Sequence, residues 1–400
     1  MALKEFPIWR KPRHHMDVDN PSDHVHWVEL FFDLVHVVTI FLLGNFLSHH
    51  LDLHGFLIFT ALFVTIFYAW ADSSVYNSLY ISTDIPHRMI MSGQIVTVMF
   101  MAAALDSAAG KGWVYFALAF AANRAFTGLL YWRARTIVEG EAAGLAYEQG
   151  RNFFILAIVF AVSALLPKPL AFWVFGAGIA GIQLQYMLPK IGTLRFRRFV
   201  PRLGHLSERF GLIMLILLGE GFFKLVVTLS DKGIDKPGAG ALFNLVIGGF
   251  CLFALGWIYF DSVGNARPRD RKAAVLLGYW FGHMVLMWST IMVGVALAGE
   301  IYVGFMEPYP LDYGWIGCTG LAIFLAAIMV LQSLVAGRDI TRRHAHGRVR
   351  LFGIAVSLLL LPLLPHVPAI AGNAIFGVAL FSQVFWPLML ALRDMRSEDA

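Results

Sequence analysis

The chain contains twelve apolar runs, each of a length that can cross a membrane. A transmembrane helix needs about 20 consecutive, mostly apolar residues. In the first half such runs cover residues 27–47, 55–80, 87–109, 112–133, 151–166 and 169–188. In the second half they cover residues 207–229, 240–262, 273–299, 313–335, 349–366 and 368–391. Charged residues make up only 14% of the chain, whereas soluble domains have about 25%. We therefore predict an all-α polytopic membrane protein with about twelve transmembrane helices.

The basic residues gather on alternate connectors between these runs. Of the 31 Lys and Arg residues, 25 fall in the N-terminal segment, every second connector and the C-terminal tail. The opposite connectors hold only Lys111, Lys168, Lys232 and Lys236. Basic residues accumulate on the cytoplasmic side of a membrane, and residues 1–25 lack the apolar core of a signal peptide. We expect a multi-pass protein of the plasma (inner) membrane with both termini in the cytosol.

The two halves of the chain open alike. His26-x-x-Glu29 begins the first half, and His205-x-x-Glu208 begins the second. Six crossings return the chain to its starting side, so tandem copies have the same orientation, as in parallel repeats about an axis along the membrane normal. We predict a cytosolic N-terminal segment (1–26), a first six-helix repeat (27–189), a basic cytosolic connector (190–206), a second six-helix repeat (207–392) and a cytosolic tail (393–400).

The basic connector is a candidate for contact with lipid headgroups. Arg195, Arg197 and Arg198 alternate with Leu and Phe, as in segments that lie on an anionic membrane surface. The alternative is a simple linker that obeys the positive-inside rule. We expect the lipid bilayer, with anionic lipids at its cytosolic face, as the main partner, and a homodimer is compatible with the sequence. No base-stacking module accompanies the basic residues, so we expect no nucleic-acid partner.

The first apolar run carries four ionisable residues on one face. At about 100° per residue, His26, Glu29, Asp33 and His36 share a stripe roughly 80° wide. Ionisable residues inside a membrane are costly and are candidates for function. Two carboxylates one turn apart cannot both stay ionised in a medium of low dielectric without a counterion. At least one of Glu29 and Asp33 should therefore bind a proton or a cation.

Further ionisable residues lie within or close to the other runs. Arg124 has no opposite charge on its own helix, so we expect it to pair with Asp33, Glu29 or Asp72, in either a structural or a functional role. Glu220 and Lys224 are four residues apart, a spacing that favours a local structural ion pair. The sequence leaves several structural alternatives open: helix-end roles for Asp72 and Asp261, a buried core histidine for His283, and an interfacial pair for Glu208 and Arg209.

Several motifs together resemble the bacterial low temperature requirement protein A family. They are Glu29-Leu-Phe-Phe-Asp33-Leu-Val, Thr83-Asp84-Ile-Pro86-His87-Arg88, Glu208-Arg209-Phe-Gly211, Leu218-Gly219-Glu220 and Tyr259-Phe-Asp261. His36 and Phe222-Phe223-Lys224 depart from the pattern, which favours apolar or small residues at these positions. The resemblance covers nearly the whole chain and implies a multi-helix inner-membrane protein. It implies no molecular activity, because the family is named for a growth phenotype.

Three functions are compatible with these residues. The favoured one is a secondary transporter or ion-conducting protein that couples to a proton, another cation or a small substrate and needs no cofactor. Its candidate site residues are Glu29, Asp33, His36, Asp72, Arg124, Glu220, Asp261 and His283. The second is a membrane-embedded metalloenzyme with a transition metal on His26, Glu29, Asp33 and His36. The third is a sensor or assembly partner without flux. We favour a protein that is not an enzyme, and no Walker A or GxSxG motif supports ATP or serine chemistry.

Overall fold

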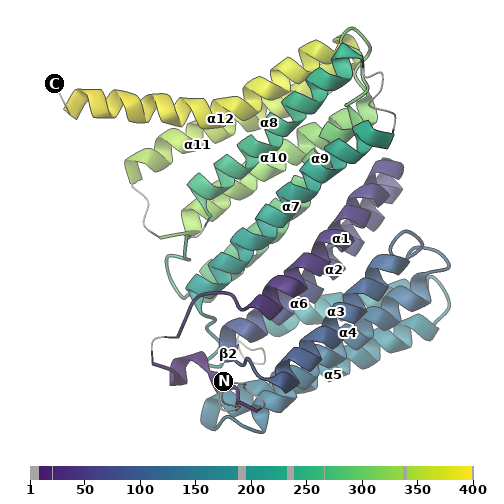
Figure 1. Cartoon of the computed structure of the whole chain (residues 1–400), viewed down its shortest axis with the longest axis vertical. Helices are drawn as coiled ribbons and strands as arrows, with labels where there is room; N and C mark the ends of the chain where they lie inside the picture. The colour runs from purple at the N-terminus through teal and green to yellow at the C-terminus, as the bar shows by residue number, and fades with distance from the viewer. Residues whose placement is uncertain are drawn as a thin grey trace, which may run out of the picture. The chain divides into compact units, whose positions relative to one another are not determined.

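The computed structural model describes residues 9–19, 21–187, 195–231, 238–264, 266–336 and 340–398. Within this part the chain is almost entirely helical (Figure 1). The first six helices are α1 (Trp27–His49), α2 (Leu53–Leu79), α3 (Ile85–Ala104), α4 (Trp113–Arg135), α5 (Gly140–Leu165) and α6 (Leu170–Met187). The others are α7 (Leu203–Asp231), α8 (Ala239–Ser262), α9 (Ala273–Gly299), α10 (Leu311–Leu334), α11 (Ile340–Leu360) and α12 (Ala369–Glu398). Eleven helical segments of the described chain are long and apolar enough to span a membrane, which confirms the all-α polytopic fold.

Short elements complete the described chain. Strand β1 (Arg13–His14) pairs antiparallel with β2 (Tyr80–Ile81), and the 3-10 turn η2 (His15–Asp17) follows β1. A second 3-10 turn, η4 (Leu361–His366), separates α11 from α12. Proline removes a backbone donor and obstructs a regular helix, so Pro362 and Pro365 account for this interruption.

The chain forms two compact units. The first unit combines Met1–Leu43 with Thr60–Arg209, and the second combines Gly44–Phe59 with Phe210–Ala400. Helices α1, α2 and α7 are therefore divided between the units. The predicted parallel-repeat arrangement of the two halves stays a prediction.

In the first unit α4 packs against both α3 and α5, and α6 packs against α5 (Figure 1). An aromatic cluster fills part of this core. The ring of Phe160 lies 4.7 Å from the rings of Phe120 and Phe175. Such tilted and edge-on pairs are favoured by the charge distribution of aromatic rings. Together they fix α4, α5 and α6 around one apolar centre.

Helix α5 begins eleven residues before the apolar run at 151–166 that the sequence analysis identified. Its first turns are polar, and two of their carboxylates bind the connector. Glu148 pairs with Arg195, and Glu141 Oε1 accepts a hydrogen bond of 2.6 Å from the backbone N–H of Arg197. Counting apolar residues detects the part of a helix that suits the membrane, whereas the backbone hydrogen bonds continue through polar turns. The apolar run therefore begins later than the helix, which starts at Gly140.

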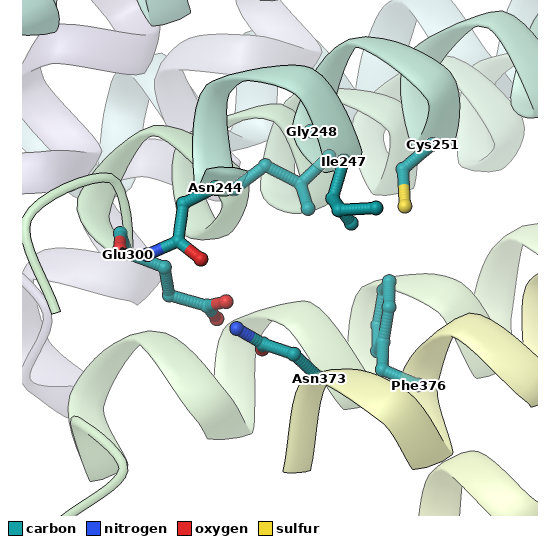
Figure 2. A pocket seen from close by; sticks show the side chains of 8 residues that line it. Asn244, Ile247, Gly248, Cys251, Glu300, Asn373 and Phe376 are labelled. Carbon is teal, nitrogen blue, oxygen red and sulfur yellow. Dashed lines mark hydrogen bonds between the residues drawn. The ribbon is translucent and has the colours of Figure 1, made fainter. Parts of the chain in front are cut away.

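In the second unit α9 packs on α10, α10 on α11, α11 on α12, and α12 on α8. Small residues allow α9 and α10 to approach closely. A Cβ atom placed on Gly317 would lie 2.9 Å from the Cβ of Ala296, and one placed on Gly320 would lie 3.0 Å from the Cβ of Met292. Small residues serve the same purpose at many helix interfaces in membranes. A small cavity lies among residues of α8, α9 and α12 (Figure 2).

Gly317→Ala should destabilise the second unit. A Cβ atom moves only with its backbone, so Ala296 cannot turn aside, and overpacking of this kind costs about 1–3 kcal/mol. Gly176→Ala in α6 is the matched control, because nothing lies within 4 Å of the added Cβ. Thermal unfolding of the purified protein, followed by tryptophan fluorescence, should show a lower midpoint for Gly317→Ala alone. Equal midpoints in the two variants would contradict the close approach.

Candidate functional site

The candidate site begins at the first turn of α1. The backbone N–H of Val28 donates to His26 Nδ1 and that of His26 donates to Glu29 Oε1, both at 3.4 Å. This reciprocal arrangement resembles a capping box, which satisfies backbone donors at the start of a helix. Burial lowers the pKa of His26 below its ordinary value, although the nearby Glu29 carboxylate opposes the shift. A neutral ring keeps Nδ1 available as the acceptor that the cap requires.

Arg209 on α7 lies between two carboxylates of α1. Its Nη1 donates to Glu29 Oε2 at 2.7 Å, and its Nη2 donates to Asp33 Oδ1 at 2.7 Å. Nη2 also donates to Ser74 Oγ at 3.0 Å, and Trp70 Nε1 donates to Asp33 Oδ1 at 2.7 Å. All five side chains are buried. With His205, they are called the Arg209 cluster below, and all its members belong to the first unit.

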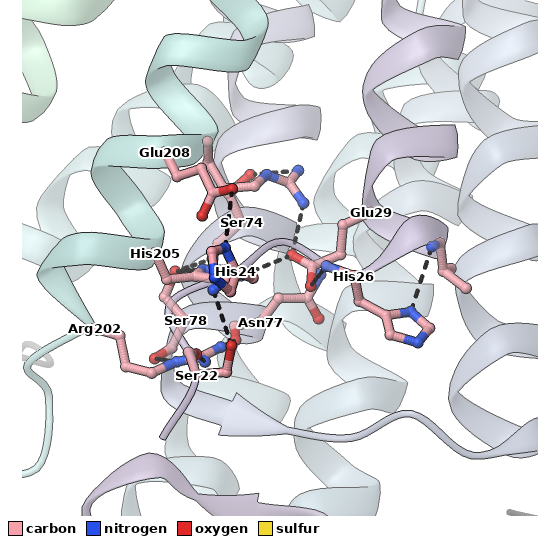
Figure 3. A network of polar contacts seen from close by, with 12 residues as sticks. Ser22, His24, His26, Glu29, Ser74, Asn77, Ser78, Arg202, His205 and Glu208 are labelled. Carbon is pink, nitrogen blue, oxygen red and sulfur yellow. Dashed lines mark hydrogen bonds and ion pairs between the residues drawn. The ribbon is translucent and has the colours of Figure 1, made fainter. Parts of the chain in front are cut away.

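His205 connects this cluster to the hydroxyl groups of α2 (Figure 3). Its Nε2 lies 3.3 Å from Glu29 Oε2, and its Nδ1 lies 2.9 Å from Ser78 Oγ. Ser78 Oγ also lies 2.8 Å from the carbonyl oxygen of Ser74, and a serine hydroxyl has one proton. When Ser78 donates to that carbonyl, His205 Nδ1 must donate to Ser78. The Nε2 atom then hydrogen-bonds to Glu29 only if the imidazole carries a second proton.

Two polar atoms of the α1 stripe are buried without a hydrogen-bond partner among the described residues. They are Asp33 Oδ2 and His36 Nε2. The other ring nitrogen of His36, Nδ1, donates to the carbonyl oxygen of Phe32 at 2.8 Å. A buried polar atom that lacks a partner is costly, so each such atom calls for an explanation. A bound proton on Asp33 would lower this cost by reducing the charge on the carboxylate.

Arg209 is a candidate site residue that the sequence analysis missed. We expected an interfacial pair of Glu208 and Arg209, but the Arg209 side chain is completely buried and Glu208 Oε1 lies 3.9 Å from His24 Nδ1. The sequence did contain a pattern that could have indicated the contact between Arg209 and α1, namely the same residue spacing on both helices. His205 and Arg209 are four residues apart, as are Glu29 and Asp33, so a basic face of one helix can meet an acidic face of another.

A second buried ion pair joins α2 and α4 in the first unit. Arg124 Nη1 contacts Asp72 Oδ2, and Tyr186 O–H donates to Asp72 Oδ1 at 2.6 Å. Arg124 Nη2 donates to Asn123 Oδ1 at 2.6 Å and to the carbonyl oxygen of Tyr68 at 3.2 Å. Of the three carboxylates expected as possible partners of Arg124, namely Asp33, Glu29 and Asp72, the structure pairs it with Asp72. One cation faces one carboxylate, and both oxygens of Asp72 are bonded.

The predicted pair of Glu220 and Lys224 stays a prediction: the two charges act on each other, and Lys224 also makes a hydrogen bond to another residue. Lys224 Nζ donates to Asn45 Oδ1 at 2.8 Å, and no ion pair with Glu220 occurs among the described contacts. Glu220 Oε1 is buried and has no hydrogen-bond partner in this part of the chain. Both side chains lie against Gly44, where an added Cβ would be 3.3 Å from Glu220 Oε1 and 3.5 Å from Lys224 Nζ. The helical spacing that places Glu220 and Lys224 together also leaves Lys224 free to reach Asn45.

The remaining site candidates of the second unit are not members of the Arg209 cluster. Asp261 is exposed, and its Oδ2 accepts a hydrogen bond of 2.6 Å from Trp257 Nε1. His283 is buried, donates from Nδ1 to the carbonyl oxygen of Tyr279 at 2.8 Å and stacks on Phe210 with 4.3 Å between ring centres. Its contacts are those of a core histidine.

The connector arginines bind protein groups in the described chain. Arg195 pairs with Glu148, and Arg198 Nη1 donates to both oxygens of Asp17 at 2.6 Å. The side chain of Arg197 is exposed. Arg195 is exposed as well, and contact of the three arginines with lipid headgroups stays a prediction.

The described residues contain no group of three or more His, Cys, Asp or Glu side chains placed to hold a metal ion. Of the four residues in the metalloenzyme hypothesis, His26 uses Nδ1 in the helix cap and His36 uses Nδ1 in a backbone bond. Glu29 and Asp33 face Arg209. The two cysteines, Cys251 and Cys318, are both buried free thiols.

A family model described as bacterial low temperature requirement A protein matches residues 24–385. The matched range contains every member of the Arg209 cluster and the Asp72–Arg124 pair. A comparison with curated proteins found no match.

Arg124→Leu should destabilise the protein strongly, because it leaves Asp72 as a buried charge without a cation. Removing one partner of a buried pair costs about 3–5 kcal/mol, whereas replacing both by apolar residues is often nearly neutral. The double variant Arg124→Leu with Asp72→Leu should therefore recover most of the loss. Thermal unfolding of the two variants and the wild type measures this. A double variant at least as unstable as Arg124→Leu would contradict a structural pair.

Proposed function

The chain belongs to the bacterial low temperature requirement A family, and we propose that it is a secondary transporter or ion-conducting protein whose Arg209 cluster takes up and releases a proton. Eleven candidate membrane spans support a protein that works within the bilayer. Buried ionisable residues in such segments commonly form proton or ion pathways. The observation that carries the proposal is the ratio of two carboxylates to one guanidinium at the centre of the cluster.

The charges in direct contact do not cancel without a further positive charge. Glu29 and Asp33 carry two negative charges when ionised, and Arg209 supplies one positive charge. A neutral His205 leaves the group at minus one. Burial of an uncompensated charge is costly, so the cluster favours one bound proton, either on His205 or on a carboxylate. His205 Nε2 and Asp33 Oδ2 are also the atoms that can accept a proton without breaking a described hydrogen bond.

Other charged groups near the cluster act on its net charge, but none of them binds both carboxylates. Arg202 and His87 lie close enough to act on the Glu29 carboxylate. Arg202 donates to the backbone carbonyl oxygens of Ser22 and Asn77, and its positive charge is shared with Asp23. The Arg209 guanidinium is the only one that binds both Glu29 and Asp33 among the described contacts. The affinity of the cluster for a proton therefore depends on these neighbouring charges.

The Asp72–Arg124 pair of the same unit provides the contrast. Its charges match one to one, and both oxygens of Asp72 are hydrogen-bonded. A closed pair of this kind holds helices together and has no vacant position for a proton. The Arg209 cluster instead has the vacant Asp33 Oδ2 and, one turn further along α1, the vacant His36 Nε2. These atoms extend the proposed proton path beyond the guanidinium.

The two alternatives require different properties. A metalloenzyme would need the His26, Glu29, Asp33 and His36 side chains to leave their present hydrogen bonds and converge on one ion. A sensor or assembly partner would need a stable partner and no flux. Elemental analysis and co-purification of the detergent-solubilised protein distinguish these from transport.

Asp33→Asn should reduce proton movement through the reconstituted protein. The amide removes the negative charge that attracts the proton, and loss of a positioned proton-transfer group costs about 100-fold or more in rate. The measurement is the pH change inside proteoliposomes that follows an imposed membrane potential. Glu208→Gln is the matched control, since Glu208 precedes Arg209 but is partly exposed and binds neither Glu29 nor Asp33. Equal flux in wild type, Asp33→Asn and Glu208→Gln would exclude the cluster as the pathway.

His205→Gln should shift the pH at which the cluster gains its proton. Glutamine retains hydrogen bonding to Ser78 but cannot become a cation, so protonation must fall on a carboxylate. Infrared difference spectra between acidic and alkaline samples should then show a protonated-carboxyl band whose pH midpoint differs from that of the wild type. Asp33→Asn identifies the carboxyl group responsible for the band. Identical midpoints in wild type and His205→Gln would exclude His205 from the proton equilibrium.

A further inference from the structure

The second unit contains a small cavity with polar side chains at one end, which the Arg209 cluster does not explain (Figure 2). Its walls come from α8, the end of α9 and α12: Asn244, Ile247, Gly248, Cys251, Leu297, Glu300, Asn373 and Phe376. The space in which the centre of a water-sized sphere fits is about 20 Å³. A volume of this size holds one water molecule or one small ion.

Glu300 brings a negative charge to this cavity at the residue that follows α9. The residue is only 7% exposed. Tyr309 O–H donates to its Oε1, and no Lys, Arg or His forms an ion pair with it among the described residues. A tyrosine hydroxyl stabilises a carboxylate but does not neutralise it. Glu300 must therefore either hold a proton or, when it is ionised, bind a cation from outside the described side chains.

Asn244 orders the same end of the cavity. Its Nδ2 donates to the backbone carbonyl oxygens of Glu300, Ile301 and Val303 at 2.9, 3.3 and 3.0 Å. Because the nitrogen faces these carbonyls, the amide oxygen points away from them, toward the carboxylate of Glu300 (Figure 2). Asn373 extends its amide into the same space from α12, with the amide nitrogen nearer the Glu300 carboxylate (Figure 2). A half-turn of this amide would present its oxygen instead. Side chains able to present oxygen therefore converge from three helical segments.

We propose that this cavity binds one small monovalent cation of the size of sodium. Glu300 supplies the negative charge, the amide oxygen of Asn244 is the second ligand, and Asn373 adds a third when its amide turns its oxygen toward the ion. A single carboxylate balances a single positive charge, whereas calcium sites use six to eight oxygens and commonly several carboxylates. Carboxylate and amide oxygens are hard ligands, which favours such an ion over a soft transition metal. The site lies in the second unit and does not depend on the proton proposed for the Arg209 cluster.

Sodium should stabilise the purified protein specifically. A ligand that binds the folded state raises its stability by mass action, so the unfolding midpoint should rise with the logarithm of the sodium concentration, by about 1 °C or more per tenfold increase. The measurement is thermal unfolding in detergent micelles at constant ionic strength, with sodium replacing choline and with potassium in a parallel series. Radiolabelled sodium at equilibrium should give one ion per chain.

Glu300→Gln should abolish the sodium-dependent rise. Glutamine retains an oxygen that accepts the Tyr309 hydrogen bond but removes the charge. Glu307→Gln is the matched control, because this nearby acid is exposed and binds only the backbone N–H of Gly304 at 3.0 Å. Asn373→Leu should weaken the sodium response at least tenfold in concentration without removing the carboxylate.

If a variant fails to fold, the sodium, potassium and choline series on the wild type still tests the proposal. Equal effects of sodium, potassium and choline, or a midpoint that follows pH but not sodium, would overturn it. A full sodium response in Glu300→Gln would overturn it as well. Asp33→Asn should keep the sodium response, so failure of the proton proposal and failure of this one are distinguishable.

Discussion

The sharing of one guanidinium by two carboxylates is the interaction on which the first unit depends most. Arg209 binds Glu29 near the start of α1 and Asp33 one turn later, and it reaches Ser74 on α2. Three helical segments are thus joined through one side chain. In an apolar environment this contact is strongly directional, because a guanidinium offers its donors in a fixed planar arrangement. The same contact leaves one negative charge unbalanced.

Stability and function place different demands on buried charges in this molecule. The Asp72–Arg124 pair balances its charge and bonds both oxygens of Asp72, although Arg124 Nε has no hydrogen-bond partner among the described residues. Such a pair is suited to holding helices in register. The Arg209 cluster and the Glu300 cavity each contain a carboxylate with incomplete compensation among the described side chains. A buried charge that the protein does not neutralise can be neutralised by a proton or a small cation. This difference separates a structural pair from a candidate ion site.

Much of the fold follows from the sequence, and the candidate site follows only in part. The apolar runs located the helices, and the stripe of Glu29, Asp33 and His36 identified the face of α1 that carries buried polar groups. The beginning of α5 before residue 151 and the hydrogen bond from Lys224 to Asn45 were not predicted, because hydropathy detects neither a helical turn outside the apolar run nor a contact with another helix. Arg209 was assigned to an interfacial pair at the membrane edge, since it lies near the start of the apolar run at 207–229, but its side chain is buried.

The sequence by itself determined that the chain is an all-helical membrane protein and which side chains are too polar for their surroundings. Hydropathy and helical periodicity are local properties, so they can be read along one segment at a time. Only the tertiary structure decided that Arg209 and His205 meet Glu29, that Asp72 takes Arg124, and that Glu300 lines a cavity with Asn244. These pairings join residues from 52 to 180 positions apart. Packing selects them among many chemically equivalent partners.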